Sequence, residues 1–379
     1  MFDGKELPLS ASKGSPECRV GRGLMFDRIE ADDYEQVVFC HHRATGLKAI
    51  VAVHSTALGP ALGGTRYYPY AGEADALEDV LRLSKGMTYK AALAGLDLGG
   101  GKAVILGDPN GDKNEALLRA FARYVDALGG RYITAEDVGT TQADMDLIRR
   151  ETRWVTGVSQ SLGGSGDPSV ATAQGLYYGL KAVAMTLWGD TNLEGRHVAV
   201  SGVGKVGYAF VRQLVEDRCR VTVADVVPAA AERAVHDFGV EVVEVEKIHA
   251  VECDVFAPCA LGGALSFQSV PELRCAAVCG CANNQLAEPG CDEALAEAGI
   301  LYAPDYCVNA GGIINISEEL RGYSRERAET ALRHIYDATL EVFARAEADG
   351  ITTAAAADRQ AEARIDAVGR LNLIRPPSR

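Results

Sequence analysis

The sequence lacks the features that would place it in a membrane or on a polyanion. It has no apolar run of 18 or more residues, and its start has neither the basic nor the apolar region of a secretory signal. Basic residues are in deficit, with 38 Lys and Arg against 52 Asp and Glu. A nucleic-acid or anionic-membrane partner would need a basic surface. We therefore expect a cytoplasmic protein with no nucleic-acid partner and no membrane partner.

A disulfide framework or a zinc-binding motif is also missing. The ten cysteines are scattered through apolar segments of a long chain, whereas disulfide frameworks belong to short secreted chains. Seven cysteines lie between Cys253 and Cys307, but the only close pair is Cys279-x-Cys281, with only His249 nearby. We predict buried thiols and no metal site, and a zinc site is the alternative.

At 379 residues the chain is too long for one ordinary core, so we expect two α/β domains. Residues 1–24 are predicted to be a disordered leader. A substrate-binding and catalytic domain is expected over residues 25–157 together with about 352–379. Its pattern includes a helix over about 75–94 and alternating strands and helices over about 103–137. The segment TGVSQSLGGSGDPS is typical of a hinge.

A dinucleotide-binding domain is expected over residues 158–351. After a long helix over about 168–189, short apolar strands alternate with helices, which predicts a Rossmann-type, doubly wound parallel sheet. Two amphipathic helices follow from about residue 324, and we expect the last to return to the first domain.

The clearest cofactor signal is the loop Gly202-Val203-Gly204-Lys205-Val206-Gly207, which follows the apolar run HVAV and precedes a helical pattern. Its glycines allow a tight turn, close approach of a pyrophosphate and helix–strand packing. The helix N-terminus favours negative charge. Asp225, about 20 residues on, can accept hydrogen bonds from a ribose 2′-hydroxyl, which favours NAD over NADP. Another adenosyl ligand, or no ligand, is the alternative.

Polar residues beside glycines mark a second site in the first domain. Lys102 follows three glycines that are predicted to precede a strand, and Asp137 ends another predicted strand. Lys90 lies twelve residues before Lys102; alone it would be taken for a solvated helix lysine. Two neighbouring ammonium groups lower one pKa, so one lysine could bind a carboxylate while the other acts as a base.

Several rare strings resemble one enzyme family in the right order. They include GPALGGTRYYPY, YKAALAGLDLGGGKAVILGDP, YITAEDVGTT, GVGKVG, CDVFAPCALGG, CANNQL and YAPDYCVNAGGIIN. From about Asp33 to about residue 370 they resemble the Glu/Leu/Phe/Val amino-acid dehydrogenases, most closely the leucine dehydrogenase branch. The resemblance implies a homo-oligomer, dimeric or larger and up to an octamer. It also implies NAD-dependent oxidative deamination of a branched-chain L-amino acid.

The same resemblance implies individual roles. Lys102 matches the general base that activates water, and Asp137 the acid/base that serves the amino nitrogen. Lys90 matches the lysine that holds the substrate carboxylate. The other implied substrate-binding positions are Leu62, Gly63, Gly64, Ala135, Asn283, Ile313 and Ile316. The implied cofactor-binding positions are Arg66, Thr172, Gly202, Val203, Gly204, Lys205, Val206, Gly207, Asp225, Ala260, Leu261 and Asn283.

Substrate preference is expected from the side-chain pocket. Glutamate-specific relatives have a lysine where this chain has Leu62, so a second carboxylate would stay unpaired. Aliphatic residues at Ala135, Ile313 and Ile316 favour leucine first, then valine and isoleucine. A dehydrogenase for phenylalanine or another hydrophobic amino acid is the alternative. A 2-hydroxy acid dehydrogenase and a non-catalytic dinucleotide sensor are more distant rivals. The first would need a suitably placed histidine, and the second would not need both lysines and the aspartate.

Overall fold

The computed structural model describes residues 25–373, and the predicted leader, residues 1–24, lies outside this range. Residues up to Asp33 form a separate unit, whose described part contains helix α1 (Met25–Ala31). All other described residues belong to a second unit, which contains two β-sheets. Within residues 25–373, no helix has the length and apolarity needed to cross a membrane.

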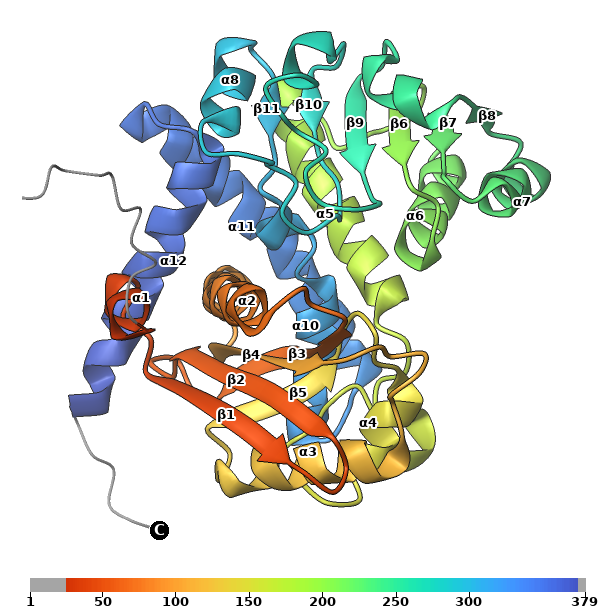
Figure 1. Ribbon diagram of the computed structural model, residues 1–379. Helices are drawn as coiled ribbons and strands as arrows, with labels where there is room; N and C mark the ends of the chain where they lie inside the picture. Colours follow the sequence, from red (N-terminus) through yellow and green to blue (C-terminus); the bar gives the residue numbers. More distant parts are fainter. Residues whose placement is uncertain (1–24, 374–379) are drawn as a thin grey trace, which may run out of the picture. The chain divides into compact units, whose positions relative to one another are not determined.

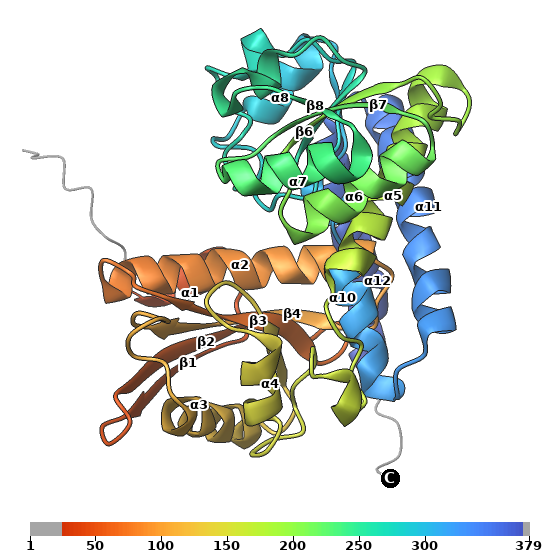
Figure 2. The same cartoon turned by 90° about the vertical axis from the view of Figure 1, so that its right-hand side faces the viewer.

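The first sheet is mixed, with the order β1-β2-β4-β3-β5. Its strands are β1 (Gln36–His42), β2 (Leu47–Ser55), β3 (Ala61–Tyr68), β4 (Gly99–Leu106) and β5 (Tyr132–Glu136). Strands β4, β3 and β5 are parallel, whereas β2 pairs antiparallel with both β4 and β1. Helix α2 (Glu73–Leu93) covers one face, and α3 (Glu115–Ala127) and α4 (Gln142–Ile148) lie on the other (Figure 1, Figure 2).

The three consecutive glycines lie inside β4, so the expectation that they precede the strand is wrong. β4 begins at Gly99, and Lys102 is its fourth residue rather than a residue at its mouth. A Cβ on Gly100 would collide with the backbone nitrogen and Oγ1 of Thr88 in α2. The glycines are therefore needed because helix and sheet approach closely at this point, which a pattern read along one strand does not reveal.

The second sheet is parallel throughout, with the order β11-β10-β9-β6-β7-β8, which confirms the predicted doubly wound fold. Along β6, Val198 and Val200 pack into one apolar cluster and Ala199 into another on the opposite face. The strand order reverses at β6, because β7 and β8 follow on one side of it and β9, β10 and β11 on the other. The carboxyl ends of β6 and β9 are therefore the switch point where such sheets bind ligands. The strands are β6 (His197–Ser201), β7 (Arg220–Ala224), β8 (Glu241–Val242), β9 (Val255–Pro258), β10 (Ala277–Val278) and β11 (Leu301–Tyr302).

Helices complete this half of the chain. Helix α5 (Ser169–Trp188) leads into it, and α6 (Lys205–Glu216), α7 (Pro228–Phe238) and α8 (Cys291–Glu297) connect its strands. Short helices α9 (Asp305–Val308) and α10 (Gly311–Ser317) precede α11 (Arg325–Asp349) and α12 (Thr353–Gly369). As expected, α12 returns to the first half, where the Arg364 guanidinium donates to the carbonyl oxygens of Leu96 at 2.7 Å and Gly95 at 3.2 Å.

The nine cysteines in the described range are all free thiols. Five of them are buried, including Cys279 and Cys281, and four are partly buried. No group of three or more His, Cys, Asp or Glu side chains within residues 25–373 is arranged to hold a metal ion.

Candidate functional site

A pocket of about 850 Å³ brings together residues that are far apart in the sequence. Its wall includes polar side chains from β4 and α2 and apolar side chains from α10. Twelve of the residues singled out in the sequence line it: Gly63, Gly64, Arg66, Lys90, Lys102, Ala135, Asp137, Thr172, Val206, Asn283, Ile313 and Ile316.

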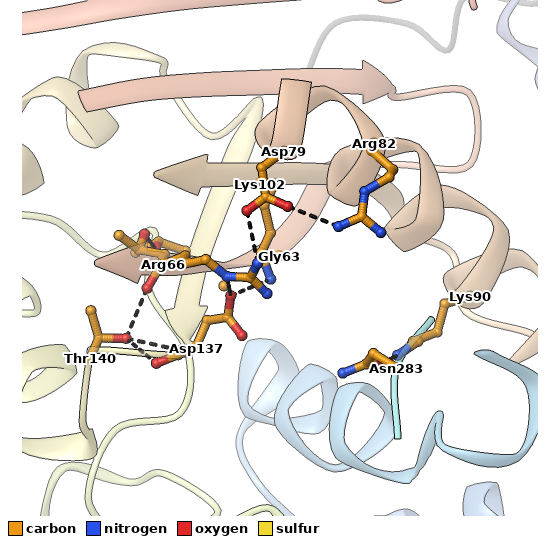
Figure 3. Close-up of polar contacts among 12 residues, drawn as sticks. Gly63, Arg66, Asp79, Arg82, Lys90, Lys102, Asp137, Thr140 and Asn283 are labelled. Atoms are coloured by element: carbon orange, nitrogen blue, oxygen red, sulfur yellow. Dashed lines mark hydrogen bonds and ion pairs between the residues drawn. The ribbon is translucent and has the colours of Figure 1, made fainter. Parts of the chain in front are cut away.

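Lys102 and Asp137 form an ion pair in the lining of the pocket. The Lys102 Nζ lies 2.9 Å from Asp137 Oδ2, and the lysine side chain is 8% exposed (Figure 3). Arg66 in β3 donates its Nε–H to the same oxygen at 3.2 Å. Burial alone would raise the pKa of Asp137, but the charges of Lys102 and Arg66 hold it below its usual value. Asp137 is therefore an ionised carboxylate beside a nearly buried ammonium group.

The turn after β5 fixes Asp137. Thr140 accepts a hydrogen bond from the Asp137 backbone N–H at 2.9 Å, and its hydroxyl contacts the Thr65 carbonyl oxygen at 2.9 Å (Figure 3). These bonds tie the aspartate backbone to β3. The carboxylate is thus positioned by a backbone that hydrogen bonds anchor, as well as by its ion pairs.

Sequence reasoning missed Asp79 of α2, which holds Arg66 from the other side. Asp79 Oδ2 accepts from Arg66 Nη1 at 2.8 Å and from the Tyr70 hydroxyl at 2.6 Å. Its other oxygen accepts from Arg82 at 2.9 Å (Figure 3). Asp79 precedes Lys90 by eleven residues, about three helical turns, so both lie on one face of α2. That spacing was the sequence signal from which Asp79 could have been assigned to the site. Arg66, predicted to contact the cofactor, thus bridges two carboxylates in the first half.

Lys90 projects into the pocket from the last turn of α2. Its Nζ donates to Asn283 Oδ1 at 3.1 Å (Figure 3). Burial lowers the pKa of Lys90 to about 8; the charge of Lys102 adds to this effect, and Asp305 and Asp137 oppose it. The lowered pKa expected of one lysine is therefore found at the proposed carboxylate clamp. The physical reason is that burial removes Lys90 from water, while its direct hydrogen-bond partner is a neutral amide that does not compensate the charge.

Part of the pocket lining is aliphatic. Ala135, Ile313 and Ile316 line it together with Met87, which the sequence did not single out. Leu62 was predicted to bind substrate, but it is fully buried in an apolar cluster with Ile313 and does not line the pocket. Leu62 packs behind the residues that line the pocket, so it can influence the shape of the pocket only through them.

The glycine loop has the geometry of a dinucleotide site. Gly202 has a φ of +101°, which allows the chain to turn sharply after β6, and α6 begins at Lys205. A Cβ on Gly204 would meet nothing within 4 Å, so the loop offers open space at the helix N-terminus. The Asp225 carboxylate accepts from the Val203 N–H and the Val227 N–H, each at 2.8 Å. The loop can therefore receive a pyrophosphate.

The other predicted cofactor residues are more scattered. Val203 is buried in the core and Leu261 is 85% exposed, whereas Ala260 lies beside Gly202. Lys205 forms an exposed ion pair with Asp167, at 3.1 Å. Neither Val203 nor Lys205 lines the pocket. Their backbone groups, rather than their side chains, are what a loop of this kind offers.

Comparison with known proteins places these features in a family. Residues 34–154 match the Glu/Leu/Phe/Val dehydrogenase dimerisation domain, and residues 227–369 match the Glutamate/Leucine/Phenylalanine/Valine dehydrogenase domain. A leucine dehydrogenase of Geobacillus stearothermophilus is 55% identical over 342 residues, which are 90% of this chain and 93% of the relative. A valine dehydrogenase of Streptomyces virginiae is 56% identical over 348 residues, or 90% and 97%.

A solved structure supports the same family assignment. The crystal structure of L-tryptophan dehydrogenase from Nostoc punctiforme has a TM-score of 0.80 and 44% identity, and the match covers 91% of this chain and 99% of that one. Relatives at this identity span substrates of different size, so the substrate has to be argued from the pocket. Identity, coverage and fold together show that the chain is an amino-acid dehydrogenase of the Glu/Leu/Phe/Val dehydrogenase family.

Proposed function

We propose that the protein oxidises a branched-chain L-amino acid with NAD and releases the 2-oxo acid, ammonia and NADH. One observation carries the proposal: a single pocket is lined both by Lys90, Lys102 and Asp137 and by the aliphatic side chains of Ala135, Ile313 and Ile316. An amino acid needs charged partners for its carboxylate and amino groups, and a branched aliphatic side chain needs an apolar wall. The leucine and valine dehydrogenases among the relatives support the same substrate class.

In this proposal, Lys90 and Asn283 bind the substrate carboxylate. Lys90 contributes an ammonium group and Asn283 an amide, and their mutual hydrogen bond of 3.1 Å keeps them adjacent. Gly63 and Gly64 of β3 also line the pocket, so the substrate backbone can lie against their main chain. The substrate side chain then extends toward Ala135, Ile313 and Ile316.

The chemical roles follow from the ion pair. NAD, when bound, supplies the acceptor for the hydride that leaves the substrate Cα. Lys102 passes its proton to Asp137 and, as the neutral amine, takes a proton from the water that attacks the resulting substrate imine. The protonated Asp137 then gives a proton to the departing nitrogen. The 2.9 Å separation of the two groups lets a proton pass directly between them. Ionised Asp137 also stabilises positive charge on the amino nitrogen.

NAD rather than NADP is proposed from Asp225. Its carboxylate lies at the end of β7 and would repel a 2′-phosphate, while each oxygen keeps a lone pair for a ribose hydroxyl. We assign the nicotinamide half of the cofactor to Arg66, Thr172, Ala260, Leu261 and Asn283, and the adenosine half to the glycine loop.

The decisive experiment is a spectrophotometric panel of L-amino acids with NAD and with NADP. Leucine, valine and isoleucine should be oxidised with NAD, leucine fastest, and glutamate very poorly. A panel in which phenylalanine or tryptophan exceeds all three aliphatic amino acids would refute the proposed substrate. Equal rates with NADP would refute the role of Asp225.

We further propose a division into a substrate lobe (25–157 with about 352–373) and a dinucleotide lobe (158–351). We also propose a cytoplasmic homo-oligomer, which the description of the matching N-terminal domain as a dimerisation domain supports. Light scattering after size exclusion would measure the oligomer, and a monomer would contradict it.

A further inference from the structure

The buried amide of Asn309 connects to the carboxylate clamp through Asn283. Asn309 follows α9, lines the pocket and is 5% exposed. Its Nδ2 donates to the Cys281 carbonyl oxygen at 3.2 Å and to Asn283 Oδ1 at 3.0 Å. Lys90 Nζ donates to that same oxygen at 3.1 Å. Three separate segments therefore converge on one amide oxygen.

The donors and acceptors along this series of hydrogen bonds permit only one orientation of each side-chain amide. A side-chain amide can turn over and exchange its nitrogen with its oxygen, so its orientation has to follow from its neighbours. The Cys281 carbonyl can only accept, so Asn309 must present its nitrogen. The second hydrogen of that nitrogen goes to Asn283, which must present its oxygen. The Lys90 ammonium can only donate and makes the same demand.

We propose that Asn309 is a positioning residue that fixes the amide orientation of Asn283 and so completes the carboxylate clamp. This inference rests on the proposed function, which assigns Lys90 and Asn283 to the substrate carboxylate. With its oxygen engaged, Asn283 turns its amide nitrogen away from Lys90, on the side of the view where Asp137 lies (Figure 3). The clamp then presents an ammonium group and an amide N–H to an anion.

The other end of Asn309 supports this role. Its Oδ1 is buried and has no hydrogen-bond partner among residues 25–373. An unpaired buried acceptor destabilises a fold. The side-chain hydrogen bonds of Asn309 among the described residues therefore all come from its donor end, which faces Cys281 and Asn283.

The test begins with Asn309→Asp, which keeps the shape of the side chain and replaces its donor with an acceptor. The new carboxylate would attract the amide nitrogen of Asn283 and turn its oxygen toward the substrate. We expect KM for leucine to rise by about tenfold or more, because a hydrogen bond to a charged group is lost, while kcat changes by less than about threefold. An unchanged KM, or a loss confined to NADH affinity, would overturn the proposal.

A double-mutant cycle separates positioning from general damage. If Asn309 acts through Asn283, then Asn309→Asp added to Asn283→Ala should leave KM at the value of Asn283→Ala alone. Additive increases in KM would overturn the proposal. If Asn309→Asp does not fold, Asn309→Ala takes its place in the same cycle, because it also removes the donor.

Gln285→Glu is the matched control. Gln285 is a fully buried amide in the loop that carries Asn283. It donates to the carbonyl oxygens of Gly280 at 2.7 Å and Ala282 at 3.1 Å. It does not line the pocket. This control should lower Tm without changing KM, and a rise in KM equal to that of Asn309→Asp would overturn the proposal.

Inactivity of the unmutated enzyme on every amino acid would refute the proposed function itself, and the inference with it. Normal activity with an additive cycle would refute only the inference.

Discussion

Replacing Ile313 by alanine should convert the pocket toward aromatic substrates. Ile313 is 5% exposed, lines the aliphatic part of the pocket and packs on Leu62 behind it. A phenyl ring in the unmutated pocket would overpack it, at about 1–3 kcal/mol. The smaller residue relieves that strain and removes about one methylene of contact with leucine, about 1 kcal/mol. The ratio of kcat/KM for phenylalanine to that for leucine should therefore rise by about 2–4 kcal/mol, roughly 30- to 1000-fold.

The variant will also be less stable. Removing three carbons at about 0.8 kcal/mol each predicts a loss of about 2.4 kcal/mol, near the lower end of the range for such core changes. Ile314→Ala is the matched control, because Ile314 is the next residue of α10, is 1% exposed and does not line the pocket. It should cost similar stability and leave the substrate ratio unchanged.

Steady-state kinetics with both amino acids and NAD, with thermal unfolding alongside, measure these effects. A substrate ratio within about threefold of the unmutated enzyme in Ile313→Ala would refute the assignment of the pocket wall. An equal shift in Ile314→Ala would show that the ratio reports loosening of α10 rather than pocket volume.

Three further outcomes are expected. Lys102→Ala should lower kcat by on the order of 10² or more, and NADH binding, measured by fluorescence titration, should stay nearly intact. An active variant with a normal pH profile would contradict the role of Lys102 as a base. Because the pKa of Lys90 is lowered to about 8, its ammonium form is lost as pH rises through that value. The inhibition constant of 4-methylpentanoate, a carboxylate without an amino group, should therefore increase above pH 8, and Lys90→Ala should abolish that dependence. Asp225→Ser should raise kcat/KM with NADP relative to NAD, and an unchanged ratio would place the carboxylate away from the ribose.

The second sheet and its glycine loop were predictable because their signals are local. Strands β6, β7, β9 and β10 lie in short apolar runs, and α6, α7 and α8 provide three of the connections as helices of ordinary period. Gly202 and the loop after it follow β6 directly, so turn and helix start could be located from a few adjacent residues. Asp137 was also predictable, because the carboxyl ends of parallel strands are where α/β folds build sites.

Asp79 and Asn309 were not predicted because their roles depend on contacts between distant segments. Asp79 matters through Arg66, and Arg66 through Asp137, which lies 71 residues further along the chain. Asn309 acts across 26 residues on an amide whose orientation no sequence pattern encodes. Periodicity identifies the face of a helix that carries a polar residue, but it does not identify the partner.

The glycine pair of β3 explains why the central ion pair can form at all. Strand β3 lies between β4, which carries Lys102, and β5, which precedes Asp137. The β3–β4 register pairs Leu62 with Gly100 and Thr65 with Ala103, which sets Gly64 beside Lys102. Neighbouring strands are about 4.8 Å apart, so the lysine side chain has to cross a whole strand to reach the carboxylate at 2.9 Å. A Cβ on Gly64 would collide with the Glu136 carbonyl oxygen and approach the Asp137 Cβ. Glycine in the middle of a strand normally weakens it. At Gly64 it instead leaves the space that Glu136 and Asp137 occupy, so a residue that looks like a defect in a strand pattern lets Asp137 lie within reach of Lys102.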